Sequence, residues 1–91
     1  MKTYLILIRG KVQGVGFRHT TCLFANELHV TGTIENLPNG EVKIIAQGTI
    51  NLLRTFIDKL HHFPNPRARI SHIYVRLADF DKHYDSFKVK F

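Results

Sequence analysis

Residues 30–47 read VTGTIENLPNGEVKIIAQ, and their pattern is the strongest sign of secondary structure in the chain. Apolar and polar side chains alternate on both sides of the triplet Pro38-Asn39-Gly40. Alternation with a period of two is typical of strands that bury one face, and a triplet of this kind is typical of a tight turn. The stretch therefore predicts a β-hairpin. The side chains expected to face inward are Val30, Ile34, Val42, Ile44 and Ala46.

A helix is expected on each side of the hairpin. From His19 to about His29, the less polar residues Thr21, Phe24, Ala25 and Leu28 recur at i, i+3, i+4 and i+7, which is the spacing of an amphipathic helix. The second helix is expected to begin after Thr49, whose hydroxyl can cap it, and to run to about His62. Its apolar stripe consists of Ile50, Leu53, Phe56, Ile57 and Leu60.

Three further strands complete the predicted order. Residues 4–8 are apolar on both faces, which is typical of a central strand buried on both sides. Residues 70–77 form another strand, and residues 86–91 form the last. Side chains predicted to face inward on the fourth strand are Ile73, Val75 and Leu77. The order βαββαβ plus a C-terminal strand indicates an α+β, ferredoxin-like split βαβ sandwich, with an antiparallel sheet and two helices on one face.

Length and composition limit the possibilities. The 91 residues suit one domain spanning 1–91, and a hydrophobic fraction of 44% is that of a folded protein. Thirteen Lys and Arg against seven Asp and Glu give a net charge of +6, which favours an anionic partner. The single cysteine, Cys22, excludes an internal disulfide and a cysteine-based zinc site. No apolar run approaches the ~20 residues of a membrane span, so a cytoplasmic protein is expected.

The loop over residues 13–18 carries the clearest chemistry. Gly14 and Gly16 permit backbone conformations that let several N–H groups converge, and the helix that follows adds the positive end of its dipole. Arg18 adds a planar guanidinium that can bind two phosphate oxygens. The loop is neither a Walker A loop nor a G-x-G-x-x-G loop. From the residues alone, a phosphoryl site and a plain glycine-rich turn with an exposed arginine both stay open.

Residues 10–18, GKVQGVGFR, resemble the first signature of the acylphosphatase family, G-x-V-Q-G-V-x-[FY]-R. A second family signature has counterparts at the expected spacing, namely Gly32, Asn36, Gly40, Val42 and Gly48. The resemblance covers essentially the whole chain. Beside Asn36, Thr33, Ile34 and Glu35 depart from the family pattern.

This resemblance implies hydrolysis of acyl phosphates to a carboxylate and inorganic phosphate, without a cofactor, a metal or a protein general base. It makes Arg18 the phosphate-binding arginine and Asn36 the residue that orients the attacking water. It makes a backbone cradle of Gln13, Gly14, Val15, Gly16, Phe17 and Arg18. The pattern of the strand leaves two readings of Asn36, either an inward amide at an apolar position or a strand-end residue turning toward the hairpin turn.

Other functions were weighed against this one. An RNA-binding module with the same element order would carry aromatic residues on its third strand, and residues 41–47 contain none. The alternatives that remain are the acylphosphatase-like N-terminal domain of a hydrogenase-maturation carbamoyltransferase and a non-catalytic module that binds a phosphate metabolite. We expect a monomer that binds an acyl phosphate or inorganic phosphate, and neither nucleic acid nor a membrane.

Overall fold

The computed structural model describes residues 1–79 and 82–91. Seven elements follow one another along the chain, and their order matches the predicted one. They are β1 (Lys2–Lys11), α1 (Phe17–Leu28), β2 (Thr31–Asn36), β3 (Val42–Gly48), α2 (Ile50–His61), β4 (Arg69–Leu77) and β5 (Phe87–Val89).

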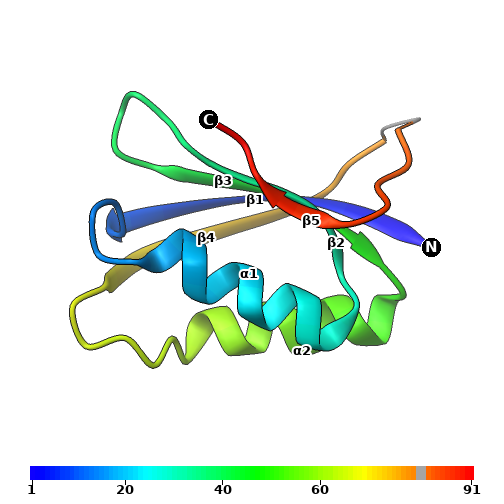
Figure 1. The fold of residues 1–91 in the computed structure, drawn as a ribbon, viewed down its shortest axis with the longest axis horizontal. Coiled ribbons are helices and arrows are strands. Elements are labelled where there is room, and N and C mark those ends of the chain that lie inside the picture. The colour runs from blue at the N-terminus through cyan, green and yellow to red at the C-terminus, as the bar shows by residue number, and fades with distance from the viewer. Residues whose placement is uncertain (80–81) are drawn as a thin grey trace.

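The strands form one sheet in the order β4-β1-β3-β2-β5, and both helices pack on the same face of it (Figure 1). The predicted α+β, ferredoxin-like fold class is confirmed. One pair departs from a wholly antiparallel sheet, because β5 runs parallel to β2. The register explains this, since the last residue of β4, Leu77, and the first of β5, Phe87, lie on one row across the sheet. A strand that begins where β4 ends must run opposite to β4, and therefore along β2.

The core lies between the sheet and the helices. Ile6 and Ile8 of β1 are fully buried there, together with inward residues of the hairpin and of both helices. The expectation that β1 is central is confirmed, but burial on both its faces is wrong. Leu5 and Leu7 point to the other face, which no helix covers in the described residues, and they are only half-buried.

The inward residues predicted for β4 are a second correction. Ile73 is partly buried, but Val75 is 41% exposed and Leu77 is 61% exposed. Val75 pairs with the buried Ile6, so it does point to the helix-bearing face. It is exposed because β4 is an edge strand, whose side chains have a neighbouring strand on one side only.

The helix boundaries differ little from those expected. α1 begins at Phe17, two residues before the predicted start, so Arg18 lies in its first turn. α2 begins after Thr49, whose hydroxyl accepts a hydrogen bond from the Leu52 N–H as predicted. In the described ranges, neither helix is long and apolar enough to cross a membrane.

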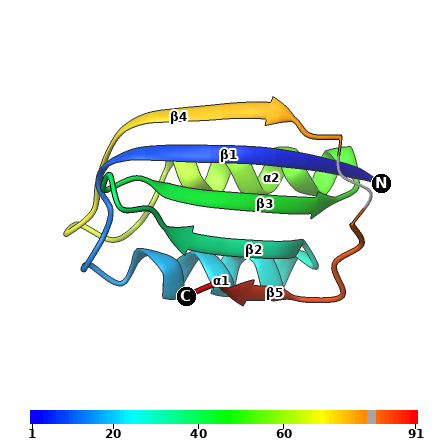
Figure 2. The same cartoon turned by 90° about the horizontal axis from the view of Figure 1, so that it is seen from above.

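Three connections meet at one end of the sheet. Figure 2 shows the β1–α1 loop, the β2–β3 hairpin turn and the α2–β4 link at the end opposite the N-terminus. Hydrogen bonds join the β1–α1 loop to each of the other two connections. The predicted phosphate-binding residues lie at this end.

Candidate active site at the start of helix α1

The loop before α1 keeps its backbone N–H groups free. Gly14 and Gly16 adopt left-handed conformations, with φ of 74° and 80°, which few other residues adopt without strain. Gly16 is the N-cap of α1, and no side chain caps this helix. Within residues 1–79 and 82–91, no N–H of residues 13–19 donates a hydrogen bond. Such N–H groups at the positive end of a helix dipole can bind an anion.

Arg18 lies in the first turn of α1 and is partly buried. Among the described residues no carboxylate pairs with it. Its guanidinium carbon is 5.5 Å from the centre of the Phe91 ring, a distance at which an arginine is attracted to an aromatic face. The charge of Arg18 is therefore available to a bound anion.

A cavity of about 280 Å³ opens in front of Arg18. It is lined by Val12, Gly14, Gly16, Phe17, Arg18, His19, Cys22, Val89 and Phe91. Burial raises the pKa of the Cys22 thiol, and nearby Arg18 lowers it less, so the thiol stays protonated at neutral pH. Within this lining, the Arg18 guanidinium and the N–H groups of the loop are the groups that suit an anion.

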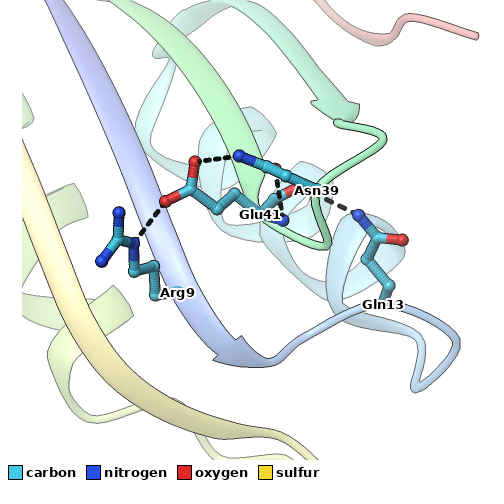
Figure 3. A network of polar contacts seen from close by, with 4 residues as sticks. All are labelled: Arg9, Gln13, Asn39 and Glu41. Atoms are coloured by element: carbon cyan, nitrogen blue, oxygen red, sulfur yellow. Dashed lines mark hydrogen bonds and ion pairs between the residues drawn. The ribbon is translucent and has the colours of Figure 1, made fainter.

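A polar network fixes the loop to the hairpin turn (Figure 3). The Gln13 amide donates to the carbonyls of Leu37 and Glu41, at 2.9 and 3.0 Å. The Glu41 carboxylate accepts from Arg9 at 2.6 Å and from Asn39 at 2.8 Å. The hydrogen bond from Arg9, followed by that from Asn39, holds the pKa of Glu41 below its usual range. The loop, the turn and the end of β1 are thereby held together.

Asn36 is the last residue of β2, and the residue after it, Leu37, receives the hydrogen bond from Gln13. Asn36 is only partly exposed, but its side-chain oxygen is buried and accepts no hydrogen bond from the residues that the structure describes. A buried acceptor without a partner is costly, so this oxygen is an unusual feature for a side chain at the end of a strand.

The predicted site residues separate into two groups. Gly14, Gly16, Phe17 and Arg18 line the cavity. Gln13 and Val15 do not, because the Gln13 amide faces the hairpin turn and the Val15 side chain is buried in the core. Asn36 is absent from the lining, and it is the residue after it, Leu37, that accepts a hydrogen bond from Gln13 of the loop.

One residue of the site was missed by the sequence reasoning. Asn65, in the α2–β4 link, donates from its side-chain amide to the carbonyl of Val15, inside the loop. The signal that could have found it is its place between Pro64 and Pro66, because two prolines fix the backbone around a side chain.

A larger hollow, of about 380 Å³, lies on the open face of the sheet. Its floor includes Leu5 and Leu7, and its lining sets the carboxylate of Glu41 beside two cations, Arg76 and Arg9, of which Arg9 already donates to Glu41. It therefore suits an anion less well than the cavity at α1. Across the described ranges, no three His, Cys, Asp or Glu side chains lie close enough together to hold a metal ion.

Comparisons with known proteins agree with this geometry. The family model described as acylphosphatase matches residues 4–89. An acylphosphatase of Lactobacillus johnsonii is 40% identical over 89 residues, which cover 98% of each chain.

Solved structures match as well. The crystal structure of acylphosphatase from Bacillus subtilis superposes with a TM-score of 0.93 at 28% identity, over 100% of both chains. Full-length HypF in a phosphate- and nucleotide-bound form superposes with a TM-score of 0.91 at 29% identity. That match covers 99% of this chain but 12% of HypF.

Proposed function

The chain belongs to the acylphosphatase family and is an acylphosphatase, and we propose that Arg18, Asn36 and the loop of residues 13–18 carry out its reaction. The observation that carries the proposal is that, among residues 1–79 and 82–91, neither the N–H groups of residues 13–19 nor the neighbouring guanidinium of Arg18 has a partner. A phosphoryl group, with several anionic oxygens, complements such a set of donors.

In the proposed reaction, the phosphoryl end of the substrate lies in the loop. Arg18 and the N–H groups of the loop balance the charge on the three equatorial oxygens. The side-chain amide of Asn36 holds a water molecule by hydrogen bonding, so that the oxygen of the water points at phosphorus. Orientation of the water and charge balance are the main contributions that an enzyme makes to phosphoryl transfer.

The bonds change as follows. The water oxygen forms a bond to phosphorus, and the bond between phosphorus and the carboxyl oxygen breaks. The carboxylate leaves with the electron pair of that bond, and the proton of the water passes to an oxygen of the phosphoryl group. Because a carboxylate is a good leaving group, no general acid is needed.

The finer features expected from the sequence belong to the same proposal. Residues 1–91 act as one unit, a monomer in the cytoplasm that uses no metal and binds neither nucleic acid nor a membrane. The unpaired cation and the N–H groups supply the charge balance that a metal ion would otherwise provide.

The test is the hydrolysis of benzoyl phosphate, measured with and without EDTA, together with inhibition by inorganic phosphate. We expect turnover that EDTA leaves unchanged and competitive inhibition by phosphate. Turnover lost in EDTA and restored by a divalent cation would refute the metal-free mechanism.

A HypF-like domain is the second candidate, and it is supported by the superposition of 99% of this chain on HypF. A domain of that kind would prefer carbamoyl phosphate, so the ratio of kcat/KM for carbamoyl and benzoyl phosphate separates the two. A chain that binds phosphate but hydrolyses neither substrate would instead be a binding module.

A further inference from the structure

The peptide between Val15 and Gly16 lies at the centre of the loop, and little within the loop holds its orientation. A peptide plane rotates through the ψ of the residue before it and the φ of the residue after it. Gly16 has a φ of 80°, and glycine adopts positive and negative φ about equally readily. An outside contact is therefore needed to select one orientation.

Asn65 supplies that contact. Its side-chain N–H₂ donates to the carbonyl of Val15. Because a trans peptide is planar, its C=O and N–H point in opposite directions. Fixing the carbonyl toward Asn65 therefore directs the Gly16 N–H away from Asn65. The cavity at α1 is lined by Gly16 but by neither Val15 nor Asn65, which agrees with a Gly16 N–H that points into it.

Asn65 is itself firmly held. Its side-chain oxygen accepts from the Arg67 N–H at 2.9 Å, and its carbonyl accepts from the Ala68 N–H at 3.1 Å. The prolines on both sides restrict its backbone. Two residues before it, Phe63 stacks on Phe17 with ring centres 4.4 Å apart, and Phe17 directly follows Gly16. The α2–β4 link is thus docked onto the first turn of α1.

We propose that Asn65 is a positioning residue of this active site, which holds the Val15–Gly16 peptide so that the Gly16 N–H donates to the bound phosphoryl group. This inference rests on the proposed function of the loop. The carbonyl of Gly16 accepts the Thr20 N–H and so begins the helix, which leaves the N–H as the group that Gly16 offers to a ligand.

Two substitutions remove the donor and keep an oxygen for the Arg67 N–H. Asn65→Asp is isosteric but adds a negative charge, and Asn65→Ser is neutral and too short to reach Val15. Asn51→Asp, on the exposed side of α2, makes the same change in net charge away from the loop. The probe is inorganic phosphate, with its Kd measured by titration and the Gly16 amide followed by ¹H–¹⁵N NMR.

We expect both Asn65 variants to weaken phosphate binding and to lower kcat/KM for benzoyl phosphate by roughly tenfold, the lower end of what supporting residues contribute. The Gly16 amide signal should shift on phosphate binding in the unsubstituted protein and should shift less in both variants. Asn51→Asp should match the unsubstituted protein.

Each other result overturns the proposal. If Asn65→Asp weakened phosphate binding and Asn65→Ser did not, repulsion by the added carboxylate would explain the loss, and not the missing hydrogen bond to Val15. Loss of thermal stability and affinity with an unchanged shift of Gly16 would mean a purely structural role. Unchanged affinity in both variants, or no shift of Gly16 in an active unsubstituted enzyme, would remove the role of Asn65 and leave the proposed function standing. An unsubstituted protein that neither hydrolyses benzoyl phosphate nor binds phosphate would instead refute the proposed function itself.

Discussion

The two glycine-containing turns at one end of the sheet differ in whether their backbone N–H groups are hydrogen-bonded. In the hairpin turn, residues 37–41, the N–H groups of Leu37, Gly40 and Glu41 all have partners within the turn. In the loop of residues 13–18, the described part of the chain offers the N–H groups no partner at all. Similar sequence features therefore serve different purposes, because one turn is closed on itself and the other is left open for a ligand.

The arginines beside the two turns differ in the same way. Arg9 donates to Glu41 of the hairpin turn, so its charge is used within the protein. Arg18 lacks a carboxylate partner in the described ranges. The N–H groups of the loop and the guanidinium of Arg18 are thus both without a partner among the residues that the structure describes. This shared property distinguishes the site from the hairpin turn more clearly than glycine content does.

Substituting Arg18 or Arg9, each on its own, should give the largest difference in activity between two variants. We expect Arg18→Ala to lower kcat/KM for benzoyl phosphate by about 1,000-fold or more, the scale of arginines that stabilise phosphoryl transfer. Arg9→Ala makes the same change in net charge and should stay near the activity of the unsubstituted enzyme. Steady-state kinetics of both variants measure this difference. Equal losses in the two would show that Arg18 acts only through net charge.

Asn36 is the last residue of β2, directly before the hairpin turn. Its substitution tests whether its side chain orients the attacking water. Asn36→Ala should lower kcat by about 100-fold, the scale for one preorganised polar group at a reacting centre. The KM should change little, because phosphate binding falls to the loop. Asn39→Ala, which removes an amide from the turn itself, is the control. A raised KM with an unchanged kcat would assign Asn36 to substrate binding instead.

The alternation of apolar and polar residues and the helical spacing were enough to predict the fold class and the boundaries of all seven elements to within a few residues, because both patterns follow directly from burial of one face. The exposure of Val75 and the half-burial of Leu5 could not be predicted this way. A pattern tells which face a side chain is on, but whether that face is covered depends on strand order and on where the helices pack.

The site was only partly accessible from the sequence. Arg18 and the glycines could be found because charge and backbone freedom are properties of single residues. The role of Asn65 could not, because its hydrogen bond to Val15 joins positions 50 residues apart and depends on how the α2–β4 link docks. The same holds for the bond from Gln13 to the hairpin turn. The assignments of Arg18 and Asn36 stay predictions that the variants above test.

The left-handed glycines offer a matched pair for stability. Gly16 has a φ of 80° and Gly40 a φ of 91°, and a Cβ at either position would meet no close neighbour. Alanine at each should therefore lower the free energy of unfolding by about 1–2 kcal/mol through backbone strain alone. Only Gly16→Ala should also weaken inhibition by inorganic phosphate. Urea unfolding and inhibition assays measure the two effects, and weakened inhibition in both variants would contradict the contrast between the turns.

The smallest effect expected is the change of stability with pH that arises from Glu41 in the hairpin turn. The hydrogen bond from Arg9 lowers the pKa of Glu41 in the folded protein from a usual value of 4.5. A carboxyl group with a lowered folded pKa stabilises the fold fully above its unfolded pKa, and that stabilisation is lost as the pH falls through the folded value. Glu41→Gln should therefore be less stable than the unsubstituted protein at pH 7, and the difference should shrink below pH 4.5.

The effect should be modest, because the Arg9 side chain is 59% exposed and solvent screens the pair. Urea unfolding at pH 7, 5 and 3, repeated in high salt, measures it. Inhibition by phosphate at pH 7 should be the same for Glu41→Gln and the unsubstituted protein. The anion is expected to bind to the loop of residues 13–18 and not to the hairpin turn. A difference in stability that stays constant from pH 7 to pH 3 would contradict this expectation. The charge of Glu41 would then add nothing to stability, and the hairpin turn would be held by hydrogen bonds that do not depend on that charge.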